Sequence, residues 1–345
     1  MIVAAILVYS LVVAALAAAG AWLMARSRVL MDKPNGRSSH AVPTARGGGL
    51  GIIAASLLGL AALGLRGHPQ LIHDPAFLGL LLGGVIAGVG GLADDIRARS
   101  YSFKLGFQVA ASAAAMGLGL MIERIYIPGF GPVALGWLAP ALTVLWLVGL
   151  TNAYNFMDGI DGLAAGTAVV AAGFLTAVLI LLRQIDASVV ACTLAAASLG
   201  FLLLNLPPAR VFMGDVGSQF TGFVFAGLAV LMARGDPTGT LIYVVPLLLF
   251  HFLFDTLFTA FRRWRAGDNI TTAHRSHLYQ RLTHAGFGHG RDTLALCAIG
   301  AAQGLGALWL VQNQPALRLA IFVPALALQI VYALAVTRYE QRVTE

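Results

Sequence analysis

The sequence predicts an all-α integral membrane protein that crosses the bilayer about eleven times and forms one domain over residues 1–345. Of these residues, 59% are hydrophobic and only 11% are charged, whereas a soluble domain has about 25% charged residues. The apolar residues also come in long runs, and about 20 consecutive apolar residues cross a bilayer as a helix. A third observation, the uneven placement of Lys and Arg, sets the orientation.

The apolar runs follow one another with short connections. The first run is expected to be an anchor and not a cleaved signal peptide, because it lacks a basic start, is too long and is followed by basic residues. In the connection at residues 123–132, a Pro-Gly pair predicts a small hairpin. We expect spans at residues 2–24, 47–65, 75–93, 105–122, 133–150, 162–182, 187–206, 216–233, 237–254, 293–314 and 319–337.

Basic residues predict that the N-terminus lies outside and the C-terminus in the cytoplasm. In that orientation 17 of the 22 Lys and Arg residues fall inside, and the outer set is Arg66, Arg124, Arg183, Arg234 and Arg318. The net charge of +7 therefore reflects topology and some attraction to anionic lipid or phosphorylated substrates, and it requires no nucleic-acid partner. Of the 15 acidic residues, 11 also fall inside. The positive-inside rule does not cover acidic residues, so their clustering predicts a site on the cytoplasmic face.

The stretch NAYNFMDGIDGLA separates two apolar runs. As a helix it would place Asn152, Asn155 and Asp158 three residues apart along one face, and Asp161 continues the step. A helix cap would account for one such acid. Four polar residues in this pattern favour a functional site, because ionisable groups within a membrane protein are costly. We expect the site to be built from the loops at residues 25–46, 94–104, 151–161, 207–217 and 255–292.

Three further acids lie at span ends. Asp94 and Asp95 end the third span, where one can bind a ligand while the other orients it. Asp215 begins the eighth span between glycines, where an N-cap is the alternative role. Mg²⁺ takes oxygen ligands and is typically held by one or two carboxylates plus substrate phosphates. The acids therefore predict a Mg²⁺ site that Mn²⁺ could also fill.

The long loop contains the stretch HRSH. His274 and His277 have a spacing that could hold a metal, but the neighbouring Arg275 favours a phosphate cradle. The basic loop DKPNGRSSHAVPTARGGG either sets topology or reaches the site with Lys33, Arg37 or His40. His251 lies within a span and is expected to be a hydrogen-bonded core residue.

Carboxylates, a cation and basic groups at a membrane surface favour phosphoryl transfer from a water-soluble donor to a lipid-borne acceptor. A polytopic transporter of a phosphorylated or anionic solute is the alternative. Transporters place such groups near the midplane, whereas these acids lie at span ends. A CDP-alcohol transferase is a third class, but its DGxxAR signature is missing, because Asp158 and Gly159 are followed by IDGLA.

These motifs resemble those of the polyprenyl-phosphate N-acetylhexosamine-1-phosphate transferases, glycosyltransferase family 4. The resemblance covers nearly the whole chain, with DD, NAYNFMDGIDGLA and FMGDVGS in that order between DKPNGRSSHAVPTARGGG and HRSHLYQRL. The family includes UDP-N-acetylglucosamine–undecaprenyl-phosphate transferases and phospho-N-acetylmuramoyl-pentapeptide translocase. It implies transfer of a HexNAc-1-phosphate from a UDP-N-acetylhexosamine to undecaprenyl phosphate, with release of UMP, at the cytoplasmic face of the bacterial inner membrane. Homodimers occur in the family.

The resemblance also implies roles for single residues. It makes Asp215 the Mg²⁺ ligand, Asp94 the base or the group facing the lipid phosphate, and Asp95 its support, with Asp158 as a further catalytic acid. Asn205 and Phe212 match positions near the uridine, where Phe212 would stack on uracil. The remaining substrate-binding positions are Lys104, Asn152, Asn155, Asp161, Arg275 and His277.

Two departures separate the chain from the translocase branch. Ala98 stands where the translocase has a lysine, and Tyr279 and Gln280 replace the histidines that follow His277. The stretch HRSHLYQRL favours the branch that begins O-antigen or capsule glycans, within lipopolysaccharide or cell-wall biosynthesis. The sequence leaves the sugar open among GlcNAc, GalNAc and their 6-deoxy relatives.

Overall fold

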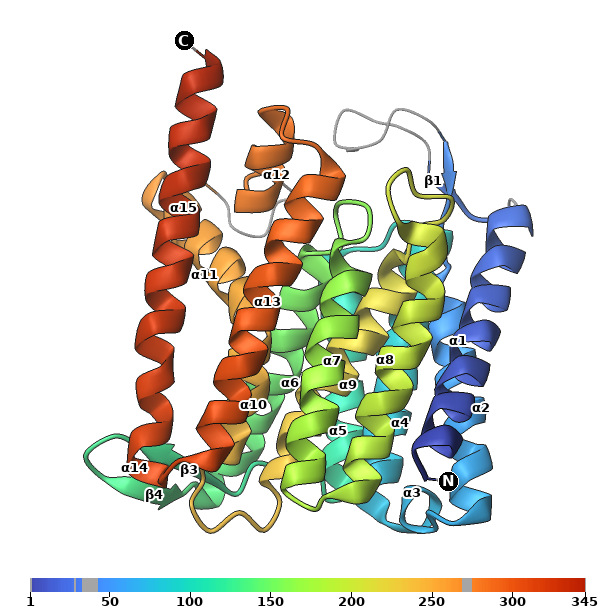
Figure 1. Cartoon of the computed structure of the whole chain (residues 1–345), viewed down its shortest axis with the longest axis vertical. Helices are drawn as coiled ribbons and strands as arrows, with labels where there is room; N and C mark the ends of the chain where they lie inside the picture. The colour runs from blue at the N-terminus through green and yellow to red at the C-terminus, as the bar shows by residue number, and fades with distance from the viewer. Residues whose placement is uncertain (1, 28, 33–42, 269–274, 345) are drawn as a thin grey trace.

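The computed structural model describes residues 2–27, 29–32, 43–268 and 275–344, and within them it is a bundle of helices with two short hairpins (Figure 1). The helices are α1 (Ile2–Ser27), α2 (Gly49–Arg66), α3 (Gln70–His73), α4 (Pro75–Ile96), α5 (Tyr101–Gly117), α6 (Ala139–Phe156), α7 (Leu163–Leu181), α8 (Ile185–Asn205), α9 (Gly214–Ala233), α10 (Val244–Leu248), α11 (Phe250–Arg265), α12 (Leu278–His284), α13 (His289–Gln312), α14 (Pro315–Arg318) and α15 (Phe322–Thr344). The strands are β1 (Met31–Asp32), β2 (Thr44–Ala45), β3 (Arg124–Ile127) and β4 (Gly131–Ala134).

The all-α membrane class is confirmed. Over the described ranges, nine helices are long and apolar enough to cross a membrane, and they occupy nine of the eleven expected spans. The span expected at residues 105–122 is α5, which begins earlier and has 17 residues. Its length is just below the 20 or so residues that cross a bilayer, so a total of eleven crossings stays a prediction.

The span expected at residues 237–254 is wrong as a single straight helix. The chain there forms α10 and α11, which meet at an angle of 72° around Leu249. Helix α11 continues to Arg265, well beyond the expected end of the span. Hydropathy measures how apolar a segment is but not the direction of its helix axis, so it could not predict the bend.

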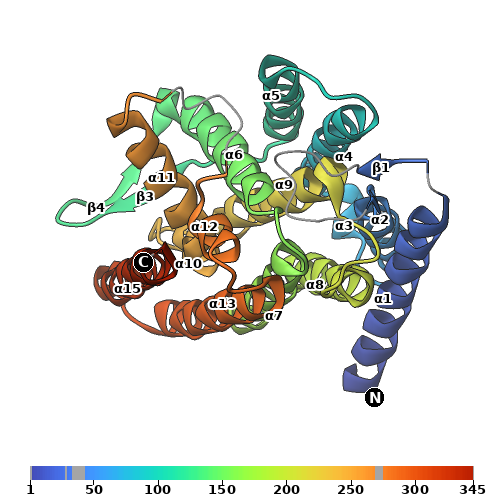
Figure 2. The same ribbon diagram turned by 90° about the horizontal axis from the view of Figure 1, so that it is seen from above.

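Helix α9 lies at the centre of the bundle, as Figure 2 shows from above. Every residue from 216 to 232 is buried. Small residues permit this packing, because a Cβ on Gly91 of α4 would run into the Asp215 backbone and a Cβ on Gly49 of α2 would meet Gly217. The end of α4 is therefore pressed against the start of α9.

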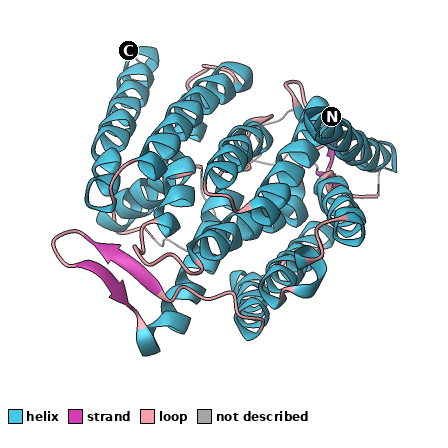
Figure 3. Ribbon diagram, turned by 60° about the horizontal axis from the view of Figure 1, so that its bottom comes forward, coloured by secondary structure: helices cyan, strands magenta, loops and turns pink. Residues whose placement is uncertain are grey.

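The bundle has two different ends. At one end, named the site end, α4 finishes, α9 begins and the chain terminates (Figure 1). At the other end, named the hairpin end, lie α3, the N-terminus and the hairpin of β3 and β4 (Figures 1 and 3). The predicted hairpin is confirmed, with Arg124 paired to Ala134 and Ile127 to Gly131. The two termini thus lie at opposite ends of the bundle.

Candidate active site

Asp95 joins two helices at the site end. Its two carboxylate oxygens accept the backbone N–H groups of Asp215 and Val216, each at 3.0 Å. The first N–H groups of a helix have no partner within it, so an acid from α4 caps α9. The Asp95 side chain is fully buried, and this contact fixes where Asp215 stands.

Arg46 balances the charge of Asp95. Its guanidinium lies 3.5 Å from Asp95 and 3.3 Å from Asp32. Burial would lower the pKa of Arg46, but these carboxylates outweigh it and hold the pKa above its ordinary value. The sequence assigned Arg46 to a basic loop without a role, since only the fold brings it to Asp95. The predicted contacts from Lys33, Arg37, His40 and His274 fall outside the described residues.

Lys104 links the other two predicted acids. Its ammonium lies 3.0 Å from an oxygen of Asp215 and 3.3 Å from an oxygen of Asp94. The second oxygen of Asp94 accepts the N–H of Arg99 at 2.7 Å. Three side chains predicted to act together are thus within direct reach of one another, although they come from α4, α5 and α9.

Two predicted asparagines tie α6 to its neighbours. Asn152 and Gln108 exchange amide hydrogen bonds at 2.7 and 3.2 Å, and Asn155 donates to the Ser218 hydroxyl at 2.7 Å. They share one helix face, as the spacing predicted. The extension of that face to Asp158 and Asp161 is wrong, because α6 ends at Phe156.

Asp158 instead lies in the turn between α6 and α7. Withdrawal from water, together with the nearby charges of Asp215, Asp95 and Asp161, raises the pKa of Asp158 to about 8, against an opposing effect of Arg46. Asp158 is therefore close enough to Asp95 and Asp215 to be affected by their charges, and these acids are called the acidic cluster.

Asp161 and Asn205 connect the two loops beside this cluster, the first between α6 and α7 and the second between α8 and α9. Asp161 accepts the N–H of Ala209 at 3.0 Å and lies 3.5 Å from His289, for which no role was predicted. Asn205 accepts from the Gly162 N–H at 3.0 Å and donates to the Val211 carbonyl at 2.9 Å. Both side chains therefore bind backbone atoms of neighbouring loops.

Phe212 lies in the second of these loops. Its N–H donates to the Ala45 carbonyl at 2.8 Å, and its carbonyl accepts the Gly48 N–H at 2.9 Å. Its ring is half-buried. The backbone contacts attach this loop to the segment that carries Arg46.

The predicted residues of the long loop lie around α12. His277 is buried and its Nδ1 is 3.1 Å from Asp255. Nη1 of Arg275 is 3.5 Å from His284, while its Nε and Nη2 are buried and have no hydrogen-bond partner among the residues that the structure describes. A buried guanidinium without a partner is costly, so these nitrogens suit an anion. The core role predicted for His251 is confirmed by its burial and a 2.7 Å contact with Gln303.

The acids suit a hard cation that a substrate helps to bind. No group of three or more His, Cys, Asp or Glu side chains that could hold a metal is present in the described part of the chain. Mg²⁺ often relies on one or two carboxylates and completes its shell with water and substrate phosphates. Asp215, at the start of α9, offers such a carboxylate.

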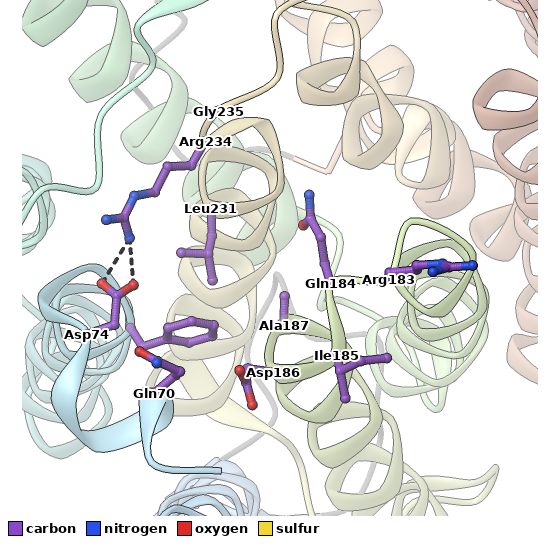
Figure 4. A pocket seen from close by; sticks show the side chains of 11 residues that line it. Gln70, Asp74, Arg183, Gln184, Ile185, Asp186, Ala187, Leu231, Arg234 and Gly235 are labelled. Atoms are coloured by element: carbon purple, nitrogen blue, oxygen red, sulfur yellow. Dashed lines mark hydrogen bonds and ion pairs between the residues drawn. The ribbon is translucent and has the colours of Figure 1, made fainter.

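The opposite end of the bundle has a pocket of about 500 Å³. It is formed where α4 and α8 begin and α9 ends, and it is edged by Asp74, Arg234 and Asp186 (Figure 4). Asp74 and Arg234 form a two-bond ion pair there at 2.8 and 2.9 Å. None of the predicted site residues lines this pocket, so it is separate from the acidic cluster.

Known proteins resemble this chain over most of its length. The family model described as glycosyl transferase family 4 matches residues 77–233. A probable undecaprenyl-phosphate N-acetylglucosaminyl 1-phosphate transferase of Bacillus subtilis is 31% identical over 279 residues, covering 81% of this chain and 76% of that protein. A decaprenyl-phosphate N-acetylglucosaminephosphotransferase of Mycobacterium leprae is 34% identical over 308 residues, covering 78% and 75%.

A second group of relatives matches a shorter part. A phospho-N-acetylmuramoyl-pentapeptide-transferase of Latilactobacillus sakei is 34% identical over 163 residues, or 44% of this chain and 50% of that protein. The matched region of the family model includes all the acids described above from Asp94 to Asp215. The chain belongs to glycosyl transferase family 4 and is a sugar-phosphate transferase of the polyprenyl-phosphate N-acetylhexosamine-1-phosphate transferase family.

Proposed function

We propose that this protein transfers an N-acetylhexosamine 1-phosphate from a UDP-N-acetylhexosamine to undecaprenyl phosphate and releases UMP. The observation that carries the proposal is the Lys104 ammonium held between Asp94 and Asp215 at one end of a membrane bundle. Metal-binding carboxylates and a cation in one place suit a reaction between two phosphate groups, whose charges must be offset. The names of the relatives that cover most of the chain support the same reaction.

The reaction requires one bond to form and one to break. An oxygen of undecaprenyl phosphate attacks the β-phosphorus of the donor, and the bond from that phosphorus to the bridging oxygen breaks. UMP leaves with the electron pair, and the lipid diphosphate sugar remains. In this direct displacement, Asp94 positions the lipid phosphate or accepts its proton.

A bound Mg²⁺ would neutralise charge on the donor diphosphate and on the leaving UMP. Asp215 and Asp158 are the residues proposed to hold it, and Mn²⁺ would be a substitute. Asp95 keeps Asp215 in place through the cap on α9. Lys104 contacts Asp215 and Asp94 and is free to swing towards a phosphate when substrates arrive, since its flexible stem carries a rotatable ammonium.

The donor side of the site is assigned to α12 and its surroundings. Two buried nitrogens of Arg275, which have no partner in the described part of the chain, support an anion there. His277 is held beside Phe156, with ring centroids 6.1 Å apart. Opposite them, Phe212 is proposed to stack on the uracil. These assignments place donor phosphates between α12 and the acidic cluster.

The cellular setting is also part of the proposal. The distribution of basic residues supports a multi-pass protein of the bacterial inner membrane with the site facing the cytoplasm, where nucleotide sugars are made. The stretch HRSHLYQRL favours a product that begins an O-antigen or capsule glycan. A screen of UDP-GlcNAc, UDP-GalNAc and 6-deoxy donors would identify the sugar.

Turnover by purified protein tests the reaction. The protein in detergent, with undecaprenyl phosphate, Mg²⁺ and a UDP-sugar labelled in the sugar, should release UMP and move the label into lipid. Asp215→Asn should abolish both signals, whereas Asp186→Asn at the hairpin end should leave them unchanged. A wild-type protein inactive with every UDP-sugar would refute the proposal, and full activity of Asp215→Asn would refute the metal assignment.

A further inference from the structure

Tyr279 of α12 closes over the turn that carries Asp158. Its side chain is fully buried, and its hydroxyl donates to the carbonyl of Phe156, the last residue of α6, at 2.9 Å. We propose that Tyr279 is a positioning residue that holds the turn at residues 156–159, so that Asp158 stays within the acidic cluster. The inference rests on the proposed function, because it assigns Asp158 to the reaction.

Gly159 shows how closely Tyr279 fits. A Cβ added to Gly159 would run into the Tyr279 hydroxyl and lie 3.0 Å from the ring carbon Cζ. The turn therefore needs glycine at the residue next to Asp158, because any side chain there would displace the tyrosine or the turn. The phenol thus contacts the turn at both Phe156 and Gly159, which flank Asp158 within two residues.

Asp255 holds the backbone that carries Tyr279. This buried carboxylate of α11 accepts the backbone N–H groups of Leu278 at 2.9 Å and Tyr279 at 3.4 Å. It also accepts the Thr259 hydroxyl at 3.0 Å and lies 3.1 Å from Nδ1 of His277. It caps α12 just as Asp95 caps α9. A helix of seven residues has little stability of its own, so the cap decides where its side chains point.

Gln280, the residue after Tyr279, also has a role within the fold. Gln280 accepts the N–H of His277 at 3.3 Å and so helps to start α12. Tyr279 binds the turn. Both residues therefore hold loops of the chain itself.

A double-mutant cycle between positions 159 and 279 tests the inference. Tyr279→Phe keeps the ring and removes the hydrogen bond, and it should lower kcat about three- to tenfold. Gly159→Ala forces the turn away from Tyr279 and should lower kcat about 100-fold. In the double variant the clash with the oxygen is gone, so kcat should recover about tenfold over Gly159→Ala, and KM for the donor should stay within about twofold throughout.

Thermal unfolding gives a second readout that needs no turnover. Mg²⁺ with UMP should raise the Tm of the wild type. The rise should vanish in Gly159→Ala and return in part in the double variant. If Gly159→Ala does not fold while the double variant does, the coupling is likewise supported.

Tyr243→Phe is the matched control, since the Tyr243 hydroxyl also donates to a backbone carbonyl, that of Tyr126 at 2.8 Å, and Tyr126 belongs to β3 at the hairpin end. Its effect should simply add to that of Gly159→Ala. Additive losses at positions 159 and 279 in both kcat and the ligand-induced Tm rise would overturn the inference. A wild type that binds Mg²⁺ and UMP but turns over no donor would instead refute the proposed function, and the Tm cycle would still decide the role of Tyr279.

Discussion

Asp95 of α4 accepts both the Asp215 and Val216 backbone N–H groups at 3.0 Å, so one acid determines the position of another. The adjacent Asp94 has a different environment. It binds the Arg99 N–H and the Lys104 ammonium at the edge of the cluster. Two neighbouring acids of one helix thus have different contacts: Asp95 holds α9, and Asp94 binds Arg99 and Lys104.

The division predicts different outcomes for two equivalent substitutions. Asp95→Asn turns one acceptor into a donor that faces an N–H group, and it should lower the free energy of unfolding by about 1–3 kcal/mol. It should also reduce UMP release, because Asp215 shifts. Asp94→Asn should reduce UMP release at least as much and leave Tm within about 2 °C of the wild type. Equal Tm values for the two variants would contradict the capping role.

The sequence predicted which residues meet but not how they are used. Span ends and charge bias were enough to bring Asp94, Asp95 and Asp215 to one end of the bundle. They could not reveal that Asp95 caps α9, because a cap from another helix depends on tertiary contact. Likewise, they could not reveal that Asp255 of α11 caps α12.

Two predicted helices, at residues 152–161 and 237–254, were wrong because the backbone there is irregular. The interval of three from Asn152 predicted one helix face, but the glycine-rich turn ends α6 before Asp158. The bend between α10 and α11 was missed for a similar reason, since an apolar run looks the same whether it is straight or bent. Asp158 still reaches the cluster, because the turn directs it there.

Lys104 should influence the need for metal. Its ammonium stands 3.0 Å from Asp215 and therefore competes with a divalent cation for that carboxylate. Lys104→Gln should lower the half-saturating Mg²⁺ concentration several-fold, while kcat falls about 100-fold because a phosphate loses its counter-charge. Titration of UMP release with Mg²⁺ measures both, and Lys104→Arg should recover part of kcat. A raised Mg²⁺ requirement in Lys104→Gln would contradict the competition.

The ion pair at the hairpin end should affect stability and leave catalysis alone. Burial alone would raise the pKa of Asp74, but the Ala76 N–H and the Arg234 guanidinium outweigh it and hold the pKa below its ordinary value. A carboxylate with a lowered pKa stabilises the folded state above its unfolded pKa of about 3.9, and this stability is lost as the pH falls through the lower folded value.

Asp74→Asn should therefore lower the free energy of unfolding at pH 7 by about 1 kcal/mol or less, since Arg234 is half exposed. The difference from the wild type should shrink as the pH falls below about 4, and UMP release at pH 7 should be unchanged. Thermal unfolding across pH measures the first effect. A difference that grows at low pH would contradict the assigned sign.

Asn205 separates a loop-holding role from a uridine-reading one. Its amide bridges the Gly162 N–H and the Val211 carbonyl, so both polar ends of the side chain are already used. Asn205→Ala should leave two buried backbone groups without partners and lower the free energy of unfolding by about 1–3 kcal/mol per group. In the remaining activity, KM for the donor should change less than about threefold. Asn205→Asp should be at least as destabilising, because a carboxylate cannot donate to Val211.

If Asn205 instead contacted the uracil, the Ala variant would keep its Tm, raise KM for the UDP-sugar and accept other nucleotide diphosphate sugars. Measuring Tm and KM on the same preparation therefore distinguishes the two roles, and the two hydrogen bonds to the backbone favour the first.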